Sequence, residues 1–477
     1  MAAAKLLGVL LAGSALSACA IDPHADASKT ALPQRYTASE QPVVSAVAEA
    51  AAQRFTLGAR PVPAWWEAYG SSALDDLVRE GLDHSPSLAA AQGSLQAARQ
   101  GLRAQVGESL LPQVDAGFAP SRQRALAMPG LPQQTLLYDV FALQAQASYT
   151  FDFFGAALHA DRALAAQVDE QSFQVDAARR DLAASIVTLS IEVAALQEQV
   201  QATTAMVALA EQAAQQAGDR QALGAASRGD AELAQLDAAQ QAAGLPALRS
   251  QLAVLRHAQA VLLGRNPQDA PPPLPLAQLH LPQEVPVSVP SALLHQRPDI
   301  LGAEAALRAA ANAADAAAAS LFPSLTLSAS YGHGAFDWGT FTSPEGVIWS
   351  VGASLTQPLF HGGALLARKH QYQAAYEAAA AQYRQTVLSA FQDVADRLAT
   401  LDEDANALAQ SERAAAAAQR AAADIEAKYR LGSVPFSATL MAGRQYQGAW
   451  VALLRARAAR LSDTAALFRS MGEPPVP

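Results

Sequence analysis

The residue with the most distinctive chemistry is Cys19, the only cysteine among the 477 residues of the chain. A lone thiol has no internal disulfide partner. It stands at the end of an apolar run that begins with Met1 and the positive Lys5 and continues to small residues, the order typical of an export signal. Because this run is too short to cross a bilayer as a helix, we expect residues 1–18 to be a signal peptide and Cys19 to be a lipid attachment site.

The four residues that end at Cys19 resemble the bacterial lipobox. Leu16 stands three residues before the cysteine, with Ser17 and Ala18 between them. In that motif the thiol receives diacylglycerol and the new N-terminus an acyl chain, which anchor a protein at roughly 0.8 kcal/mol per buried CH₂. The next residue is Ala20 instead of the aspartate that favours retention at the inner membrane, so the resemblance implies an outer-membrane lipoprotein. The alternative is an ordinary A-x-A cleavage site, after which Cys19 is discarded with the leader.

No catalytic or metal-binding motif follows the leader. The nine histidines form no H-E-x-x-H or paired metal spacing, and neither G-x-S-x-G nor a P-loop occurs. The formal net charge of −10 argues against nucleic acid as a partner. No run of about 18 apolar residues follows the leader, which disfavours a helical transmembrane protein. We therefore expect no enzyme and no cofactor beyond the covalent diacylglycerol and N-acyl chain on Cys19.

The elements that position the remaining candidate residues are duplicated. Three pairs of matching segments recur along the chain: Ser109-Leu110-Leu111-Pro112 with Ser320-Leu321-Phe322-Pro323, Phe154-Gly155 with the residues near Phe360, and Leu223-Gly224 with Leu431-Gly432. The matches keep their order at an offset of about 210 residues, which indicates a duplicated unit. We expect a lipidated N-terminal segment over 19–70, two repeats over 71–264 and 291–471, and a C-terminal tail over 472–477.

The segment between the repeats, 265–290, is rich in proline. Prolines at this density cannot continue a helix and favour extended chain. A disordered linker between independent domains is one interpretation. Interleaved apolar residues favour a packed crossover instead: Leu274, Leu276, Leu279, Leu281, Val285 and Val287.

Two segments of alternating polarity follow the first helix of each repeat. They cover 114–118 and 141–151 in the first repeat and 325–331 and 347–355 in the second. Such alternation predicts strands with one apolar and one polar face. A soluble antiparallel sheet over a core is one interpretation. The longer strands, however, have the length that crosses a bilayer at a tilt, and aromatic residues near their ends could form an interfacial girdle: Tyr138, Phe141, Phe336, Trp338, Phe341 and Trp349.

Four strands cannot close a barrel. Because an unpaired backbone group in hydrocarbon costs several kcal/mol, a membrane sheet of this size must be completed by other chains. Oligomerisation follows from the strand count, but the number of subunits does not.

Two long proline-free segments, 154–220 and 360–431, predict helices of about 100 Å. Apolar residues recur along them at alternating spacings of four and three, a 3.5-residue period that is typical of helices wrapped around each other. The positions are Leu182, Ile186, Leu189, Val193, Leu196, Val200, Thr203, Val207 and Ala210, and Tyr376, Ala380, Tyr383, Val387, Phe391, Val394, Leu398, Leu401, Ala405 and Leu408. Gly224 and Gly432 end these helices, and return helices are expected over 230–264 and 436–471.

This combination resembles the TolC-like outer-membrane efflux factors, in their lipoprotein branch, over essentially the whole mature chain. The matching stretches form an ordered series: Trp65-Trp66, Leu111-Pro112, 149–155, 262–264, Gln296-Arg297-Pro298-Asp299-Ile300, 321–325, 357–363 and Tyr429-Arg430-Leu431-Gly432. The resemblance implies an α+β fold in which a trimeric outer-membrane β-barrel, four strands per chain and twelve in total, is continued by a long coiled-coil α-helical periplasmic barrel. The proline-rich crossover would lie in an equatorial region.

The function implied by the resemblance is that of a passive exit duct for small toxic compounds. Its partners would be two further copies of the chain, a periplasmic membrane-fusion adaptor, an inner-membrane efflux pump and outer-membrane lipid. The alternative is a periplasmic coiled-coil structural or adaptor lipoprotein without a pore, which has no need of the alternating strands. A lipid-anchored periplasmic enzyme has no motif in its favour.

The helix turns are the candidate periplasmic aperture and adaptor-docking tips. Asp230 and Glu232 follow Gly224, and in a trimer each carboxylate would form a ring whose repulsion favours cation binding or a loosened aperture. Their alternative role is that of first-turn residues favoured by the helix dipole. After Gly432 the corresponding positions are Ala438 and Met441, so a second acidic ring is absent and apolar contact could constrict the aperture instead.

Overall fold

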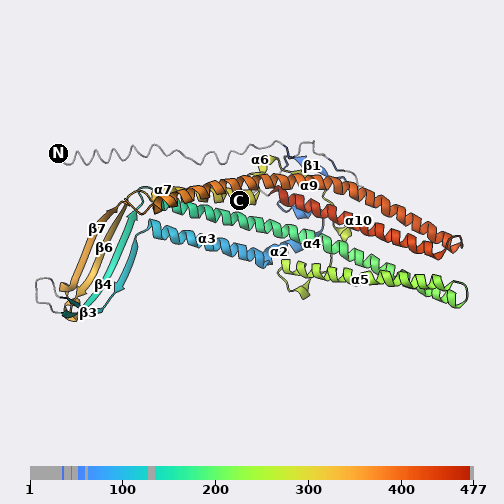
Figure 1. Cartoon of the computed structure of the whole chain (residues 1–477), viewed down its shortest axis with the longest axis horizontal. Coiled ribbons are helices and arrows are strands. Elements are labelled where there is room, and N and C mark those ends of the chain that lie inside the picture. Colours follow the sequence, from blue (N-terminus) through green and yellow to red (C-terminus); the bar gives the residue numbers. More distant parts are fainter. Residues whose placement is uncertain (1–34, 37–43, 46–51, 60–62, 127–134, 473–477) are drawn as a thin grey trace. The chain divides into compact units, whose positions relative to one another are not determined.

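The structure is a computed structural model that describes residues 35–36, 44–45, 52–59, 63–126 and 135–472. The signal peptide, Cys19 and residues 473–477 of the tail lie outside the described residues. The chain forms two compact units (Figure 1). The sheet unit comprises the described residues of 101–167 and 306–384, and the coil unit comprises those of 33–100, 168–305 and 385–477.

The sheet unit contains one antiparallel sheet, built from β2 (Gln113–Phe118), β3 (Ser121–Leu126), β4 (Thr135–Phe151), β6 (Ser324–Ala335) and β7 (Val347–Thr356). β2 and β3 both pair with β4 and keep one register on either side of Pro120, so they act as a single interrupted strand. The sheet therefore has four strand positions, in the order β2/β3, β4, β6 and β7. The four expected strands are confirmed. β3 was not predicted because its polar sequence does not alternate.

The two faces of the sheet differ in polarity as the alternation predicted. Direct cross-strand partners share a face, and Tyr149 lies opposite Leu327, which lies opposite Ala353. This apolar face consists of the even-numbered residues 114–118 of β2 and the odd-numbered residues 141–151, 325–335 and 347–355 of the other strands. The opposite, polar face carries hydroxyl pairs such as Thr150 with Thr326, at 3.0 Å.

Long helices attach at one end of this sheet. α3 (Pro86–Leu110) and α7 (Pro298–Ala319) lead into β2 and β6, and α4 (Ala156–Ala222) and α9 (Ala364–Arg430) follow β4 and β7. The sequence predicted one helix before β2, but α2 (Ser72–His84) and α3 are separate. The break falls where Pro86 has no N–H to donate to a continuing helix.

At the opposite end of the sheet, the one-turn helix α8 (Trp338–Phe341) folds onto the apolar face. The ring centroids of Trp338 and Phe341 lie 5.4 and 6.0 Å from that of Phe141. Phe341 also contacts Phe118 of β2 at 6.0 Å. Several residues of the expected aromatic girdle therefore do cluster at this end.

The coil unit is dominated by two helical hairpins, α4 with α5 (Arg228–Leu262) and α9 with α10 (Phe436–Met471). α4 and α9 have 67 residues each, or about 100 Å at 1.5 Å per residue. Of the expected heptad positions, all but Leu189 and Tyr376 are buried. The coiled packing predicted from the 3.5-residue period is confirmed (Figure 1).

The contacts within each hairpin change along its length. Val193, Leu196 and Val200 of α4 pack against Leu245 and Leu252 of α5. Farther along, the same two helices meet through alanines only: Ala210, Ala214, Ala217, Ala231, Ala234 and Ala238. Small side chains allow the helices to approach closely. None of the described helices has an 18-residue window apolar enough for a membrane span.

The proline-rich segment packs against the rest of the coil unit. β5 (Glu284–Val287) pairs in parallel with β1 (Arg54–Leu57), and Leu276, Val285 and Val287 are buried. The short elements here are η2 (Trp65–Tyr69), η3 (Pro267–Asp269), η4 (Leu276–Gln278) and α6 (Pro290–Leu293). The apolar residues between the prolines thus form a packed crossover.

Candidate functional site

The two hairpin turns end their helices as the glycines predicted. Gly224 and Gly432 both have a φ of 73°, a left-handed conformation that glycine adopts without steric cost. The amide of Ala225 donates to the carbonyl of Arg220 at 2.7 Å, which closes the first turn. Leu223 and Leu431, the residues before the glycines, are 82% and 83% exposed. Each tip therefore presents a large apolar side chain to its surroundings.

The two predicted carboxylates are held by their own helix. Ser227 caps α5: its Oγ accepts from the amide of Asp230 at 3.0 Å and donates to the Asp230 carboxylate at 2.8 Å. Glu232 accepts from Arg228 at 2.8 Å. Within one chain, these contacts are those of first-turn residues at a helix N-terminus.

A contact that the sequence did not predict joins the two tips. Arg220 of α4 donates from Nη1 to the hydroxyl of Tyr429 on α9, at 2.7 Å. The Tyr429 ring lies 5.5 Å from Phe436, and Phe436 packs on the alanine cluster of α4 and α5. This tip contact links both hairpins. Only the Tyr-Arg-Leu-Gly stretch, noted for its family resemblance, hinted that Tyr429 has a role.

A second link between the hairpins lies farther from the tips. Arg444 of α10 pairs with Asp237 of α5, whose side chain is 1% exposed. Gln241 donates to the other oxygen of this carboxylate at 2.8 Å. A buried carboxylate with both oxygens engaged is costly to leave unpaired, so this pair fixes α10 against α5.

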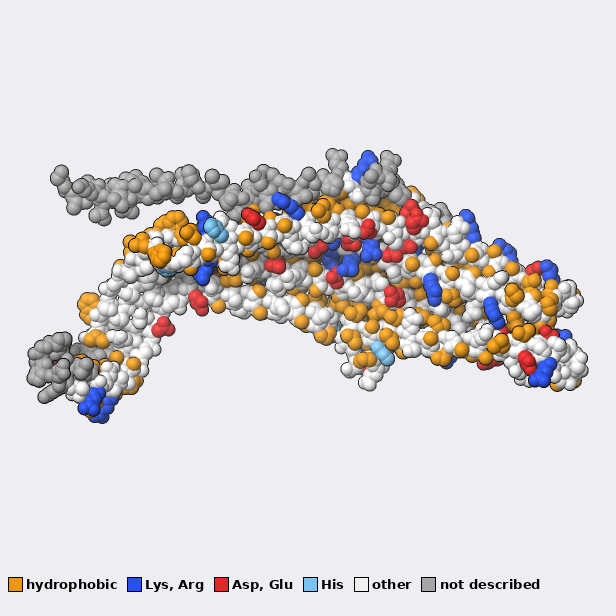
Figure 2. Space-filling model, in the orientation of Figure 1, with side chains coloured by type: hydrophobic (Ala, Val, Ile, Leu, Met, Phe, Trp, Pro, Cys, Tyr) orange, Lys and Arg blue, Asp and Glu red, His pale blue; other side chains and the backbone are white. Residues whose placement is uncertain are grey.

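Ion pairs in the middle of the coil unit join α7, α9 and α10, where acidic and basic side chains gather (Figure 2). Arg297, with a 13% exposed side chain, contacts Asp299 at 2.8 Å and Asp393 at 3.2 Å. Burial disfavours its charge, yet the two carboxylates raise its pKa. Arg397 continues the chain of charges to Asp393 at 3.6 Å and to Asp463 at 3.4 Å. Alternating charges of this kind tie α7, α9 and α10 of the second repeat together.

Asp404 of α9 and Asp463 of α10 form a carboxyl pair at the end of this network. Burial, followed by the charge of Asp463 and a hydrogen bond with it, raises the pKa of Asp404 to about 7, against an opposing effect of Arg460. Two neighbouring carboxylates disfavour the ionisation of both. Asp404 therefore retains its proton up to near neutral pH. Sequence gave no sign of it, because the partners lie on different helices.

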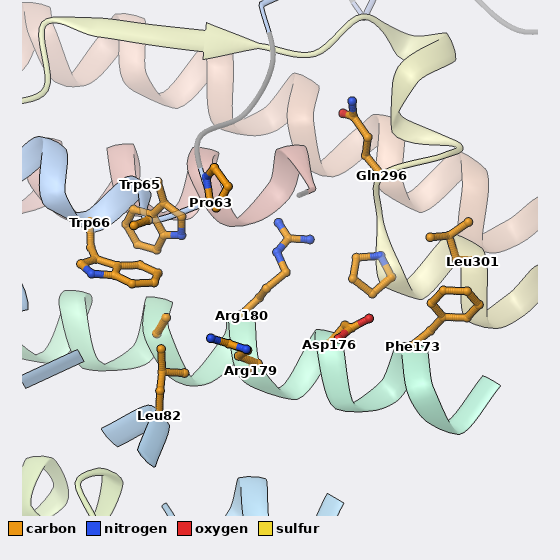
Figure 3. A pocket seen from close by; sticks show the side chains of 13 residues that line it. Pro63, Trp65, Trp66, Leu82, Phe173, Asp176, Arg179, Arg180, Gln296 and Leu301 are labelled. Carbon is orange, nitrogen blue, oxygen red and sulfur yellow. The ribbon is translucent and has the colours of Figure 1, made fainter. Parts of the chain in front are cut away.

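A pocket of about 270 Å³ lies between α4, the segment around Trp65 and the start of α7 (Figure 3). The indoles of Trp65 and Trp66 line one side, and Asp176 and Arg180 of α4 line another. Arg180 donates to the carbonyl of Arg469 at 2.7 Å, so it also ties α4 to the end of α10. Trp65, 3% exposed, stacks on Phe468 at 5.4 Å. These residues join α4 and η2 to the end of α10.

Among the residues that the structure describes, no three His, Cys, Asp or Glu side chains lie together in a way that could hold a metal ion. The site residues thus offer helix ends, salt links and packing.

The model of the outer membrane efflux protein family matches residues 77–265 and 289–473, more than half of the chain. The chain belongs to this family. The two matched segments flank most of the proline-rich segment, which agrees with the internal duplication. Members of the family are channel proteins of the outer membrane, and the chain is assigned to the outer membrane with them.

Individual relatives of the family support the same assignment. The pyoverdine export outer membrane protein OpmQ of Pseudomonas aeruginosa is 30% identical over 422 residues, which cover 86% of either chain. OpmQ of Pseudomonas putida is 31% identical over 428 residues, 87% of this chain and 88% of that protein.

Solved structures of the family share the fold. The structure of VceC from Vibrio cholerae aligns with a TM-score of 0.75 at 26% identity and covers 87% of this chain and 99% of that one. The outer-membrane channel OprN aligns with a TM-score of 0.81 at 24% identity and covers 92% of this chain and 99% of that one. The α+β architecture predicted from the sequence is therefore that of known outer-membrane efflux channels.

Proposed function

We propose that this protein is the outer-membrane duct of a tripartite efflux system, and that three copies of the chain form it. The observation that carries the proposal is the sheet. Its apolar face exposes large side chains, with Trp349, Val351 and Leu355 each more than 70% exposed. Its outer strands, β2/β3 and β7, each pair on one side only within the described residues.

An exposed apolar face and two open strand edges are both costly in an isolated chain. An open strand edge in hydrocarbon leaves backbone groups without hydrogen bonds, at several kcal/mol each. Joining β7 of one copy to β2/β3 of the next removes every edge, and it places the apolar face outward against lipid and the polar face inward. Three copies with four strand positions each make twelve strands, a size that leaves a polar lumen.

The duct itself is passive. The charged groups described above are engaged in salt links or helix caps, and none is arranged as a nucleophile with a base. Energy and substrate would therefore come from an inner-membrane pump, through a periplasmic adaptor. The relatives named for pyoverdine export and for toluene efflux carry different compounds, so the substrate of this chain is proposed only as a small toxic compound.

The hairpin tips are the proposed docking surface for the adaptor and the site of the periplasmic aperture. Each tip exposes one leucine beside a glycine turn, Leu223 and Leu431, which suits an apolar contact with a partner helix. The contact between Arg220 and Tyr429 holds the two hairpins of one chain together. Opening would separate these hairpins. Asp230 and Glu232 are proposed to add a ring of negative charge at that level in the trimer.

Lipid on Cys19 is proposed as a secondary anchor, because the barrel alone would hold the protein in the membrane. A Cys19→Ser chain with a cleavable leader should still assemble in the outer membrane. Release of that chain into the periplasm would show that lipid is the sole anchor.

A periplasmic scaffold without a pore is the second candidate, and the exposed apolar sheet face disfavours it. Single-channel recording decides between the two. The purified full chain, inserted into a planar phosphatidylcholine bilayer, is expected to give discrete conductance steps and to migrate as a heat-labile trimer on gels. A monomer that produces no conductance would exclude the duct.

A further inference from the structure

Two arginines stand where the apolar face of the sheet ends. Arg122 and Arg124 of β3 lie opposite Asp139 and Leu137 of β4. Since β2 and β3 keep one register with β4, these arginines share the face of Phe118 and Phe141. Figure 2 shows basic side chains gathered at this end of the sheet, where Figure 1 places β3.

Their distance along the strand places them at the level of lipid headgroups. From Phe151 to Phe141, β4 rises about 34 Å, and a strand tilt of about 40° reduces this to roughly 26 Å along the membrane normal, the height of an apolar band. Arg122 and Arg124 lie two and four residues beyond Phe141 in register. They therefore fall roughly 5 to 10 Å outside the hydrocarbon, inside the headgroup layer.

The guanidinium groups of Arg122 and Arg124 have N–H donors that the described residues do not use. Arg122, whose side chain is 69% exposed, approaches Asp139 through Nε at 3.6 Å. Arg124 donates from Nε to the Thr135 hydroxyl at 3.0 Å. Among the described residues, the terminal nitrogens of both make no hydrogen bond. Two such nitrogens match the oxygens of one phosphate group.

Aromatic side chains at the same end supply the apolar part of the surface. Trp338 is 58% exposed, and the rings of Trp338 and Phe341 lie 5.4 and 6.0 Å from that of Phe141, which shares the face of the arginines. Amphipathic rings are enriched where acyl chains meet headgroups. Arginine above an aromatic belt is the arrangement expected for a phosphorylated lipid.

Three carboxylates lie at this end as well. Asp337 is engaged by the amide and hydroxyl of Thr340, at 2.9 and 2.7 Å, and caps α8. Asp139 faces Arg122, and Glu345 is exposed in the turn η5 (Pro344–Gly346). These carboxylates offset part of the positive charge at this end, because a nearby negative charge repels an anionic ligand.

We propose that Arg122 and Arg124 bind the phosphate groups of glycolipids in the outer leaflet, with the aromatic residues around α8 against their acyl chains. This lipid site rests on the proposed function, because it requires the β3 end of the sheet to face away from the periplasmic helices. It would fix the depth of the barrel in the membrane.

Lipid retention by the purified full-length trimer tests the site. The trimer is equilibrated in separate experiments with lipid A, with lipid A whose phosphates have been removed, and with phosphatidylcholine, and the retained lipid is counted by native mass spectrometry. About thirtyfold more lipid A than dephosphorylated lipid A is expected, because two basic residues near a charged lipid contribute about 1 kcal/mol each. Equal retention of both glycolipids would overturn the proposal without any variant.

Variants locate the site. R122Q/R124Q is expected to lower lipid A retention to the dephosphorylated level, R122K/R124K to an intermediate level, and R99Q/R103Q, two exposed arginines on α3, to leave it unchanged. Unchanged retention in a folded R122Q/R124Q trimer would place the lipid elsewhere. Conductance in phosphatidylcholine separates the two proposals: steps without lipid preference would remove only the lipid site, whereas absent steps would remove the duct.

Discussion

The coil unit buries its apolar residues within one chain, whereas the sheet unit displays them. Ile186 and Val394 of the coil unit are fully buried, but Val351 and Leu355 of the sheet unit are 76% and 72% exposed. Both units have regular apolar periodicity, of 3.5 residues in one and 2 in the other. The difference shows that the same hydrophobic pattern can be satisfied by the chain itself or only by lipid and further copies.

The comparison predicts the largest effect for truncation in the coil core. Leu401→Ala removes a side chain that is 0% exposed on α9, and a cavity of this kind costs about 2 to 5 kcal/mol of unfolding free energy. Denaturant unfolding of the detergent-solubilised protein measures it. Glu403→Ala, exposed on the same helix, is expected to stay within about 0.5 kcal/mol. Equal effects from both would show that the coil is not packed within the chain.

A charge on the apolar face of the sheet should act only in the membrane. Val351→Arg lies near the middle of the expected membrane span and should cost about 2 to 4 kcal/mol per chain, seen as loss of trimers in outer-membrane fractions. Ser350→Arg, one residue away on the polar face, should assemble and change only the conductance. If both variants assemble equally, the assignment of lipid and lumen faces is wrong.

The carboxyl pair gives the coil unit a pH dependence between about pH 4 and pH 7. The pKa of Asp404 is raised to about 7, against an ordinary value of 3.8. Between these values the folded state therefore binds more protons than the unfolded state. Stability is therefore full below about pH 4 and falls as pH rises to about 7. With screening by solvent taken into account, the loss is about 1 to 2 kcal/mol.

Asp404→Asn should remove this slope and make the protein more stable at pH 8. Thermal unfolding between pH 5 and 8 measures both the pH dependence of stability and the stability at pH 8. A slope that persists in Asp404→Asn would assign the titration to another group.

The smallest effect is expected at the tips. Tyr429→Phe removes the hydroxyl that accepts from Arg220 and should cost about 1 kcal/mol at most, because the contact is exposed. The effect of Tyr429→Phe on conductance should be larger than its effect on stability, because loss of the contact should let the closed duct conduct more. Tyr446→Phe on α10 serves as a control for loss of a hydroxyl. If Tyr429→Phe and the parent protein conduct equally, the contact between Arg220 and Tyr429 takes no part in gating.

Sequence predicted the coil unit well because its pattern is local. The heptad positions from Leu182 to Ala210 could be found by counting the spacings of apolar residues. Gly224 and Gly432 marked the helix ends because glycine adopts the left-handed conformation without steric cost. The bounds of α5 and α10 followed from these turns. In the sheet unit, β3 was missed because Arg122 and Arg124 replace the apolar half of the alternation.

Contacts between distant residues could not be predicted in the same way. Arg220 meets Tyr429 only because the two hairpins lie side by side, and Asp404 meets Asp463 only because α9 and α10 pack against each other within one hairpin. Neither pair has a spacing or composition that stands out in one sequence. The predicted roles of Asp230 and Glu232 depend on other copies of the chain, so they remain proposals.

We propose that β7 of one copy pairs with β2 of the next until three copies close the sheet. Cysteine pairs test it directly, with Ala116 or Val114 on β2 and Val351 or Ala353 on β7 replaced two at a time. Oxidation in the outer membrane, followed by denaturing gels, should give a covalent trimer for at least one pair and nothing larger. If every pair gives only monomers, or a ladder that extends past three chains, the closed trimeric barrel is contradicted.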